Sequence, residues 1–304
     1  MNMGPALYIG ALTLLLGLAV NSNAKDYYLE LDINKGINSN VFLSADEDIV
    51  VSDTASDQDV QTQFSLMGSY EFFDGENSDA KVLLDYFSES FDSNDLDSTV
   101  TSVSVPVTFY SDNYRLRVTP AVMSYNLSGE NVLKYTQGRL DVARKIHDVR
   151  VGVQYGYSKK SPQTSSYDVY EGNSQNIKTY ASFSNYGSKI RLNLNVFDNN
   201  YADEYISNNG FYLQASYKKR FNDTGIRVST KYKNTQYISD ILLDDIARND
   251  QQVSISYLQD YYVNNIVELY ISSEYIKNNS NIEFDDTNYN YNQWVNTLGM
   301  RFVF

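Results

Sequence analysis

After residue 26, the chain alternates between apolar and polar residues with a period of two along nearly its whole length. In the segment 149–160, for example, the sequence VRVGVQYGYSKK places valine or tyrosine at every second position over its first nine residues. This period indicates β-strands that have one apolar face and one polar face. We predict fourteen strands, at 26–34, 59–72, 80–90, 98–110, 113–126, 131–144, 149–160, 174–185, 188–199, 209–221, 224–236, 250–260, 264–277 and 290–304.

The connections between these strands alternate between two length classes. Short turns rich in Gly, Asn and Asp lie near 74–75, 111–113, 145–148, 185–187, 222–225 and 260–264. The other connections are mostly longer and polar, at 35–58, 91–97, 161–173, 200–208, 237–249 and 278–289, with one short exception near 127–130. An even strand number with short turns at one end and long loops at the other is typical of bacterial outer-membrane barrels.

A closed sheet would leave none of these long amphipathic strands with an unpaired edge, and lipid tolerates no unpaired backbone. The predicted fold is therefore all-β: a single closed antiparallel transmembrane β-barrel over residues 25–304, with about fourteen strands and with twelve or sixteen as alternatives. Two prolines, Pro106 and Pro120, fall inside predicted strands, where each removes one hydrogen-bond donor. We expect local bulges at both.

The amino-terminal segment has the pattern of a cleaved signal peptide. An apolar run from Ala6 to Val20 precedes Asn21-Ser22-Asn23-Ala24, which has small residues where signal peptidase requires them. We expect cleavage after Ala24, so that 1–24 is the signal peptide. No later apolar stretch approaches the length of a transmembrane helix. Because the first strand follows the cleavage site closely, we also expect no amino-terminal plug.

The composition excludes several kinds of chemistry. The chain has no cysteine, one histidine and a formal net charge of -14, so it offers no thiolate nucleophile and no multi-histidine metal site, and it does not suit nucleic acid. His147 lies in a short turn and has no triad geometry. We expect no enzymatic activity and no cofactor or metal, although a glycosidase site built from carboxylates alone stays open.

If the apolar faces contact lipid, the polar faces line the barrel lumen, and their charges separate into two walls. The middle strands supply a basic wall: Arg115, Arg117, Arg150, Lys178, Arg191, Lys218, Arg227, Lys231 and Lys233. The strands near the closure of the barrel supply an acidic wall: Glu30, Asp32, Glu71, Asp85, Glu89, Glu268 and Glu274. Opposed walls create a transverse field that would filter solutes by charge and size.

Two properties of the lumen stay open. Its charges could pair and fill it, but side chains alone fill barrels of about eight strands, which favours an open or gated pore. The longest loop, 35–58, is the candidate constriction and carries the acids Asp46, Glu47, Asp48, Asp53 and Asp57, with Asp59 just beyond it. Calcium binding is the alternative to a solvated acidic loop, but the spacing lacks the glycine and glutamate of a calcium loop.

The last strand ends on an aromatic residue. On one parity it carries Trp294, Leu298, Met300, Phe302 and Phe304. With the signal peptide and the strand pattern, this terminus resembles the bacterial outer-membrane β-barrel superfamily, which includes the porins. The resemblance implies a cell outer membrane of a Gram-negative bacterium, contact with its lipid and lipopolysaccharide, and recognition of the terminal strand by the barrel assembly machinery.

A weaker likeness concerns the segment Gly36–Phe42, which is similar to the openings of barrels from surface-lipoprotein or polysaccharide export systems. Those families usually carry a periplasmic helical-repeat domain ahead of the barrel, and this chain does not. We therefore expect a passive outer-membrane diffusion channel for small polar solutes. The alternative is a non-conducting structural or export-accessory barrel.

Overall fold

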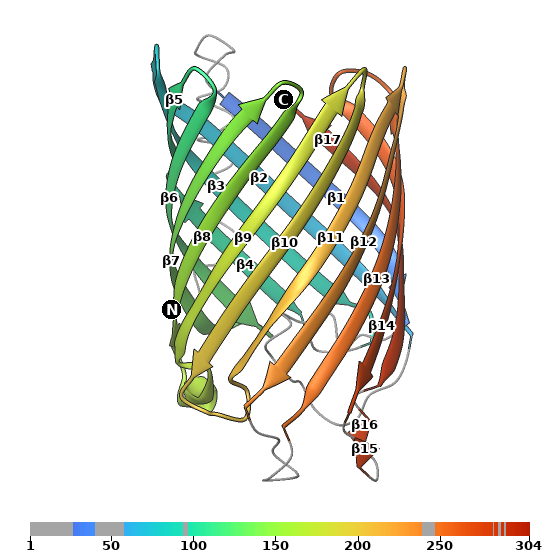
Figure 1. The fold of residues 1–304 in the computed structure, drawn as a ribbon. Coiled ribbons are helices and arrows are strands. Elements are labelled where there is room, and N and C mark those ends of the chain that lie inside the picture. Colours follow the sequence, from blue (N-terminus) through green and yellow to red (C-terminus); the bar gives the residue numbers. More distant parts are fainter. Residues whose placement is uncertain are drawn as a thin grey trace.

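The computed structural model describes residues 27–39, 58–93, 97–238, 247–281 and 290–304, with the backbone of 283–284 and 287–288. The predicted signal peptide and most of the acidic loop 35–58 lie outside the described residues. Within them, antiparallel strands tilt around a single closed barrel (Figure 1). The all-β closed barrel predicted from the alternating pattern is therefore confirmed.

The barrel has fourteen strands, because the short strands β4 and β5 are two halves of one strand position between β3 and β6. The ring closes where β1 pairs with β17, and the pairing runs from Glu30 opposite Val303 to Asn38 opposite Val295. The strands are β1 (Tyr27–Asn38), β2 (Asp59–Gly75), β3 (Ser78–Phe91), β4 (Ser98–Ser104), β5 (Val107–Ser111), β6 (Tyr114–Leu127), β7 (Glu130–Ile146), β8 (Val149–Pro162), β9 (Gly172–Asn185), β10 (Ser188–Tyr201), β11 (Asn208–Phe221), β12 (Thr224–Tyr237), β13 (Asn249–Tyr262), β14 (Val267–Ser280) and β17 (Tyr291–Val303).

The outer surface of the barrel is apolar. Side chains such as Val122 and Leu192, each 54% exposed, point outward from positions that alternate with inward polar residues. Soluble monomeric proteins rarely expose so many large apolar side chains, and this outward apolar pattern is typical of transmembrane β-barrels. Among the described residues, no helix is long and apolar enough to span a membrane.

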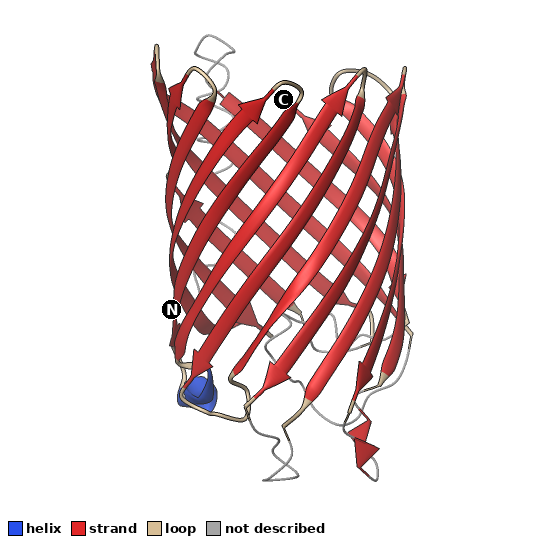
Figure 2. Cartoon of the chain, viewed as in Figure 1, coloured by secondary structure: helices blue, strands red, loops and turns tan. Residues whose placement is uncertain are grey.

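The two ends of the barrel differ, as the connection lengths predicted (Figure 2). At the turn end, tight hairpins join β5 to β6, β7 to β8, β9 to β10 and β11 to β12. Their first residues, Asp112, His147, Tyr186 and Asn222, adopt left-handed conformations with φ between 32° and 53°. This conformation suits two-residue hairpins, because its twist matches that of the strands. At the loop end lie the longer connections and the 3-10 helix η2 (Ser165–Tyr170).

The prediction of bulges at the prolines is wrong. Pro106 falls in the gap between β4 and β5, and the pairing with β3 and β6 continues across that gap without a register shift. Pro120 stays paired with Gly138 in a regular ladder. A proline loses only its own donor, and its carbonyl still accepts: Val105 donates to Pro120, and Lys81 donates to Pro106.

Register shifts occur elsewhere in the sheet. One lies between Glu71 and Phe73 of β2, and the other lies between Tyr125 and Asn126 of β6. Both adjoin a hairpin end, where an extra residue bends the strand without disturbing the middle of the wall.

Candidate functional site

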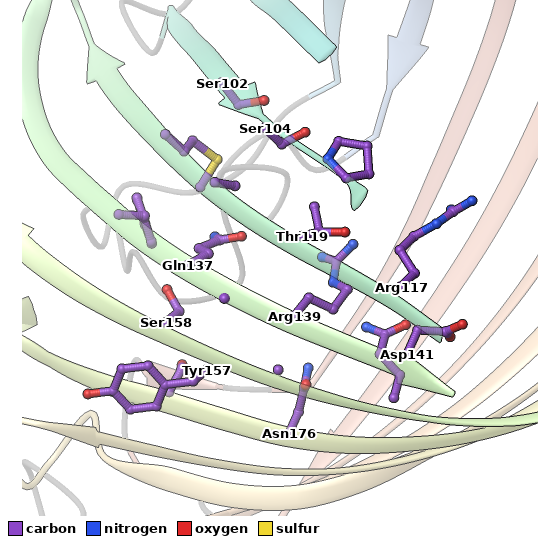
Figure 3. A pocket seen from close by; sticks show the side chains of 18 of the residues that line it. Ser102, Ser104, Arg117, Thr119, Gln137, Arg139, Asp141, Tyr157, Ser158 and Asn176 are labelled. Atoms are coloured by element: carbon purple, nitrogen blue, oxygen red, sulfur yellow. The ribbon is translucent and has the colours of Figure 1, made fainter. Parts of the chain in front are cut away.

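The inner wall of β3–β10 encloses a cavity of about 830 Å³ within the lumen. Seven of its lining residues are basic, and two are acidic, Asp85 and Asp141. The basic residues are Arg115, Arg117, Arg139, Arg150, Lys160, Lys189 and Arg191. Hydroxyl and amide side chains fill the spaces between these charges, and Figure 3 shows Thr119, Gln137 and Asn176 among them. The cavity is therefore polar, and its charge is mostly positive.

The predicted basic residues lie along β6–β12. Arg115, Arg117, Arg150 and Arg191 line the cavity. Lys178 lies on β9 between Asn176 and Tyr180, which line the cavity. All three occupy alternate positions of the strand and therefore share its inward face. The others continue around the wall: Lys218 is paired with Arg227 across β11 and β12, Lys231 lies over the Tyr212 ring, and Lys233 lies over the Phe197 ring.

Several of these cations are held by aromatic rings and neutral groups. The Arg191 guanidinium lies 5.0 Å from the centroid of the Tyr180 ring and donates from Nε to Asn193. The Arg117 Nε donates to Thr108. Such contacts orient a cation but leave its charge uncompensated.

The predicted acidic residues lie on the strands from β14 through β17 and β1 to β3. Three of them, Glu30, Asp32 and Glu268, surround Arg301 of β17 with contacts of 3.0–3.1 Å. The others are distributed along the wall: Glu71 pairs with Lys81, Asp85 accepts from Ser102, Glu89 accepts from Gln63, and Glu274 stands farther along β14. The acidic wall therefore has one tight cluster and four separate carboxylates.

One hydrogen-bonded group, here called the Tyr180 network, joins four strands near the turn end. It consists of Tyr180, Gly152, Asp141 and Arg115. The Tyr180 ring lies over Gly152, where a Cβ atom would come within 2.4 Å of the ring. Its hydroxyl reaches Asp141 at 3.0 Å, and Asp141 accepts from Arg115 at 2.6 Å.

A second group, the Tyr270 network, has the same construction across the closure of the barrel. It consists of Tyr270, Gly299, Asp32 and Arg301, with Glu30 and Glu268 around the guanidinium. The Tyr270 hydroxyl donates to Asp32 at 2.6 Å, and the ring lies over Gly299. Gly152 is on the seventh barrel strand and Gly299 is on the fourteenth, so the networks lie on opposite walls.

At the loop end, the connection that contains η2 packs over the inner wall. Tyr170 of η2 is buried against Tyr125, Leu127 and Tyr135. Next to this cluster, the Lys160 ammonium donates to the Tyr201 hydroxyl at 2.7 Å. The sequence analysis expected the constriction in the loop 35–58, most of which lies outside the described residues. It placed the connection 161–173 but did not predict its inward packing, because periodicity carries no information about loops.

The terminal residues face outward. Trp294, Leu298 and Phe304 are 51%, 66% and 58% exposed, and Met300 and Phe302 share their parity. The Phe304 backbone exchanges two hydrogen bonds with Leu29 of β1. The chain therefore ends in the closing ladder of the barrel.

Parity could have identified some functional residues that the sequence analysis left out. Arg139, Asp141, Lys160 and Lys189 each share the parity of the inward residues on their strands, and all four line the cavity. The position of Arg301 between three carboxylates could not be read from one strand, because it depends on the pairing of β17 with β1 and β14. Within the described residues, no group of three or more histidine, cysteine or acidic side chains is arranged to hold a metal ion.

Comparison with known proteins shows the fold. No protein-family model and no curated protein matches the chain. Among solved structures, OmpT, an outer membrane protein of Vibrio cholerae, has a TM-score of 0.54 at 7% identity, covering 92% of this chain and 97% of that chain. A loop L8 deletion mutant of OmpT gives 0.52 at 6% identity, covering 92% and 98%. The chain therefore has the porin-like fold of outer-membrane β-barrels.

Proposed function

We propose that this protein is a passive diffusion channel of the bacterial outer membrane for small polar solutes. The observation that carries the proposal is the polar cavity of about 830 Å³ inside a barrel of fourteen strands. Side chains can fill a barrel of eight strands, whereas wider barrels leave an aqueous lumen. The hydroxyl, amide and charged groups around this cavity would replace part of the water around a polar solute.

The outward apolar band and the likeness to OmpT support a location in the outer membrane. In that membrane the hairpins of the turn end would face the periplasm, and the longer connections would face outward. The inward charges would then act on permeating solutes. Screening limits an exposed charge to about 8 Å at physiological salt, so wall residues act mainly on solutes beside them.

The test is single-channel recording of the purified barrel in planar lipid bilayers. We expect discrete conductance steps and, under a salt gradient, a reversal potential that favours anions. Replacing Arg117, Arg191 and Arg227 by glutamine should move that potential toward cations. A variant on the acidic strands, Asp85→Asn with Glu89→Gln, should move it the other way.

A barrel that inserts but shows no steps would overturn the channel proposal. That result would favour the alternative, a non-conducting structural or export-accessory barrel. The inward packing of the η2 connection is the feature that favours this alternative.

A further inference from the structure

Three cations gather on the inner face of β7–β10, where the cavity lies. Lys178 is within electrostatic range of both Arg139 and Arg191. Arg139 and Arg191 themselves line the cavity, and Figure 3 shows Arg139 pointing into it. Like charges at such range repel each other, so this arrangement favours an anion among them.

No carboxylate of the described residues compensates these three charges fully. Asp141, the carboxylate that acts on Lys178, already accepts from Arg115 at 2.6 Å and from the Tyr180 hydroxyl at 3.0 Å. Arg139 and Lys178 make no ion pair or hydrogen bond with any residue that the structure describes. Arg191 is held by Asn193 and by the Tyr180 ring, both of which leave its charge available.

Neutral polar atoms in the same wall also lack partners. The Ser158 Oγ and the Asn176 Oδ1 are buried atoms without a hydrogen bond within the described part of the chain. Both residues line the cavity, and Gly156 lies between their positions on the wall. Both residues are only partly buried, so a rotation of either side chain would present its oxygen to the cavity, where a solute hydroxyl can donate and accept.

We propose that this wall is a binding subsite for small hydroxylated organic oxyanions, with Arg139, Lys178 and Arg191 contacting the oxyanion and with Ser158 and Asn176 contacting hydroxyls. The proposal rests on the channel function above and names its preferred solute class. Guanidinium groups match the geometry of both carboxylate and phosphate, so the shared chemistry is the oxyanion. Binding at the wall would concentrate such solutes in the lumen and slow each passage.

Glucose and three of its derivatives distinguish the effect of the oxyanion from that of the hydroxyls: glucosamine, glucuronate and glucose 6-phosphate. In the single-channel experiment, we expect glucuronate or glucose 6-phosphate to interrupt the current in a concentration-dependent way, whereas glucose and glucosamine interrupt it far less. Titration calorimetry of the full barrel in detergent micelles measures the same binding without conductance. The comparison of the two acidic hexoses shows which oxyanion is preferred.

The variant Arg139→Gln with Lys178→Gln should weaken binding of the acidic hexoses about tenfold or more, since it removes charge-assisted contacts. A matched control, Lys218→Gln with Arg227→Gln, removes the same charge from the same wall outside the subsite and should change binding less than about twofold. Folding of each variant is checked by its heat-modifiable mobility.

Two outcomes would overturn the subsite. In one, calorimetry and current block show no preference for the acidic hexoses over glucose. In the other, both double variants weaken binding equally, which would mean that the general field of the wall attracts the anion. If the barrel conducts in either case, the channel proposal stands. If it binds acidic hexoses but never conducts, only the channel proposal fails.

Discussion

The Tyr180 and Tyr270 networks share one construction and have opposite charge balances. In each, a tyrosine ring lies over a glycine of the neighbouring strand, and its hydroxyl donates to an aspartate two strands away. Asp141 is a single carboxylate beside Arg115, with Arg191 stacked on the tyrosine. Around Arg301, by contrast, three carboxylates share one guanidinium.

The comparison separates the contacts that stabilise the barrel wall from the charges that a solute in the lumen would contact. The shared part, a tyrosine ring over a glycine with its hydroxyl on an aspartate, joins three adjacent strands on each side of the barrel. The differing part is the surplus charge, which is positive at one network and negative at the other. Only the Tyr180 network borders the cavity, through Tyr180, Asp141 and Arg115. Under the proposed channel function, the tyrosines would stabilise the scaffold and the surplus cations would act on the solute.

The largest expected effect is at Arg301, because its removal leaves three carboxylates without their shared cation. Arg301→Met should lower the free energy of unfolding by about 3–5 kcal/mol, as expected when one partner of a buried ionic group is removed. Unfolding by guanidinium in detergent micelles, followed by the fluorescence of Trp294, the single tryptophan, measures this change.

Arg301→Lys is the control for that variant. It keeps one positive charge among the three carboxylates and should recover part of the lost free energy, although it cannot contact all three in the fixed geometry of a guanidinium. If Arg301→Met unfolds within about 0.5 kcal/mol of the unchanged protein, the network does not stabilise the closure between β14, β17 and β1.

The next effect concerns the glycines below the two rings. A Cβ atom at Gly152 would lie 2.4 Å from the Tyr180 ring, and one at Gly299 would lie 2.3 Å from the Tyr270 ring. Gly152→Ala and Gly299→Ala should each cost about 1–3 kcal/mol, because each ring must move. Gly138 on β7 is the matched control, since a Cβ atom there meets nothing within 4 Å.

The same unfolding experiment measures the change in the free energy of unfolding for each glycine variant. Gly138→Ala should change the free energy of unfolding by less than about 0.5 kcal/mol. Equal effects at Gly138 and Gly152 would contradict the close ring-to-backbone packing and, with it, the shared construction of the two networks.

Much of the fold could be predicted because a barrel strand repeats one simple pattern. In transmembrane β-barrels, apolar side chains occupy every second position, so the alternation in 149–160 was enough to place β8 and its two faces. The closing pair of β1 and β17 followed from the need to leave no edge. The bulges expected at Pro106 and Pro120 failed, because a proline removes one donor but does not force an extra residue into the strand.

The candidate site could be predicted only in part. Parity placed Arg115 and Arg191 on the inner face, since that property belongs to a single strand. The opposite charges that surround a charged side chain depend on the register of several strands. The sequence therefore did not predict the cluster around Arg301 or the position of the Tyr180 ring over Gly152. The inward packing of Tyr170 belongs to a loop, where no periodic pattern exists to interpret.

The smallest expected effect distinguishes the two tyrosines themselves. Tyr180→Phe and Tyr270→Phe each keep the ring over its glycine and remove one hydroxyl that donates to a carboxylate, a contribution of about 1.5 kcal/mol. Asp141 forms a one-to-one ion pair with Arg115 within the described residues, whereas Asp32 shares Arg301 with Glu30 and Glu268. The loss at Asp32 is therefore less well compensated, and Tyr270→Phe should destabilise the barrel more than Tyr180→Phe. The reverse order in guanidinium unfolding would mean that the single carboxylate of the basic wall, and not the crowded acidic cluster, depends more on its tyrosine.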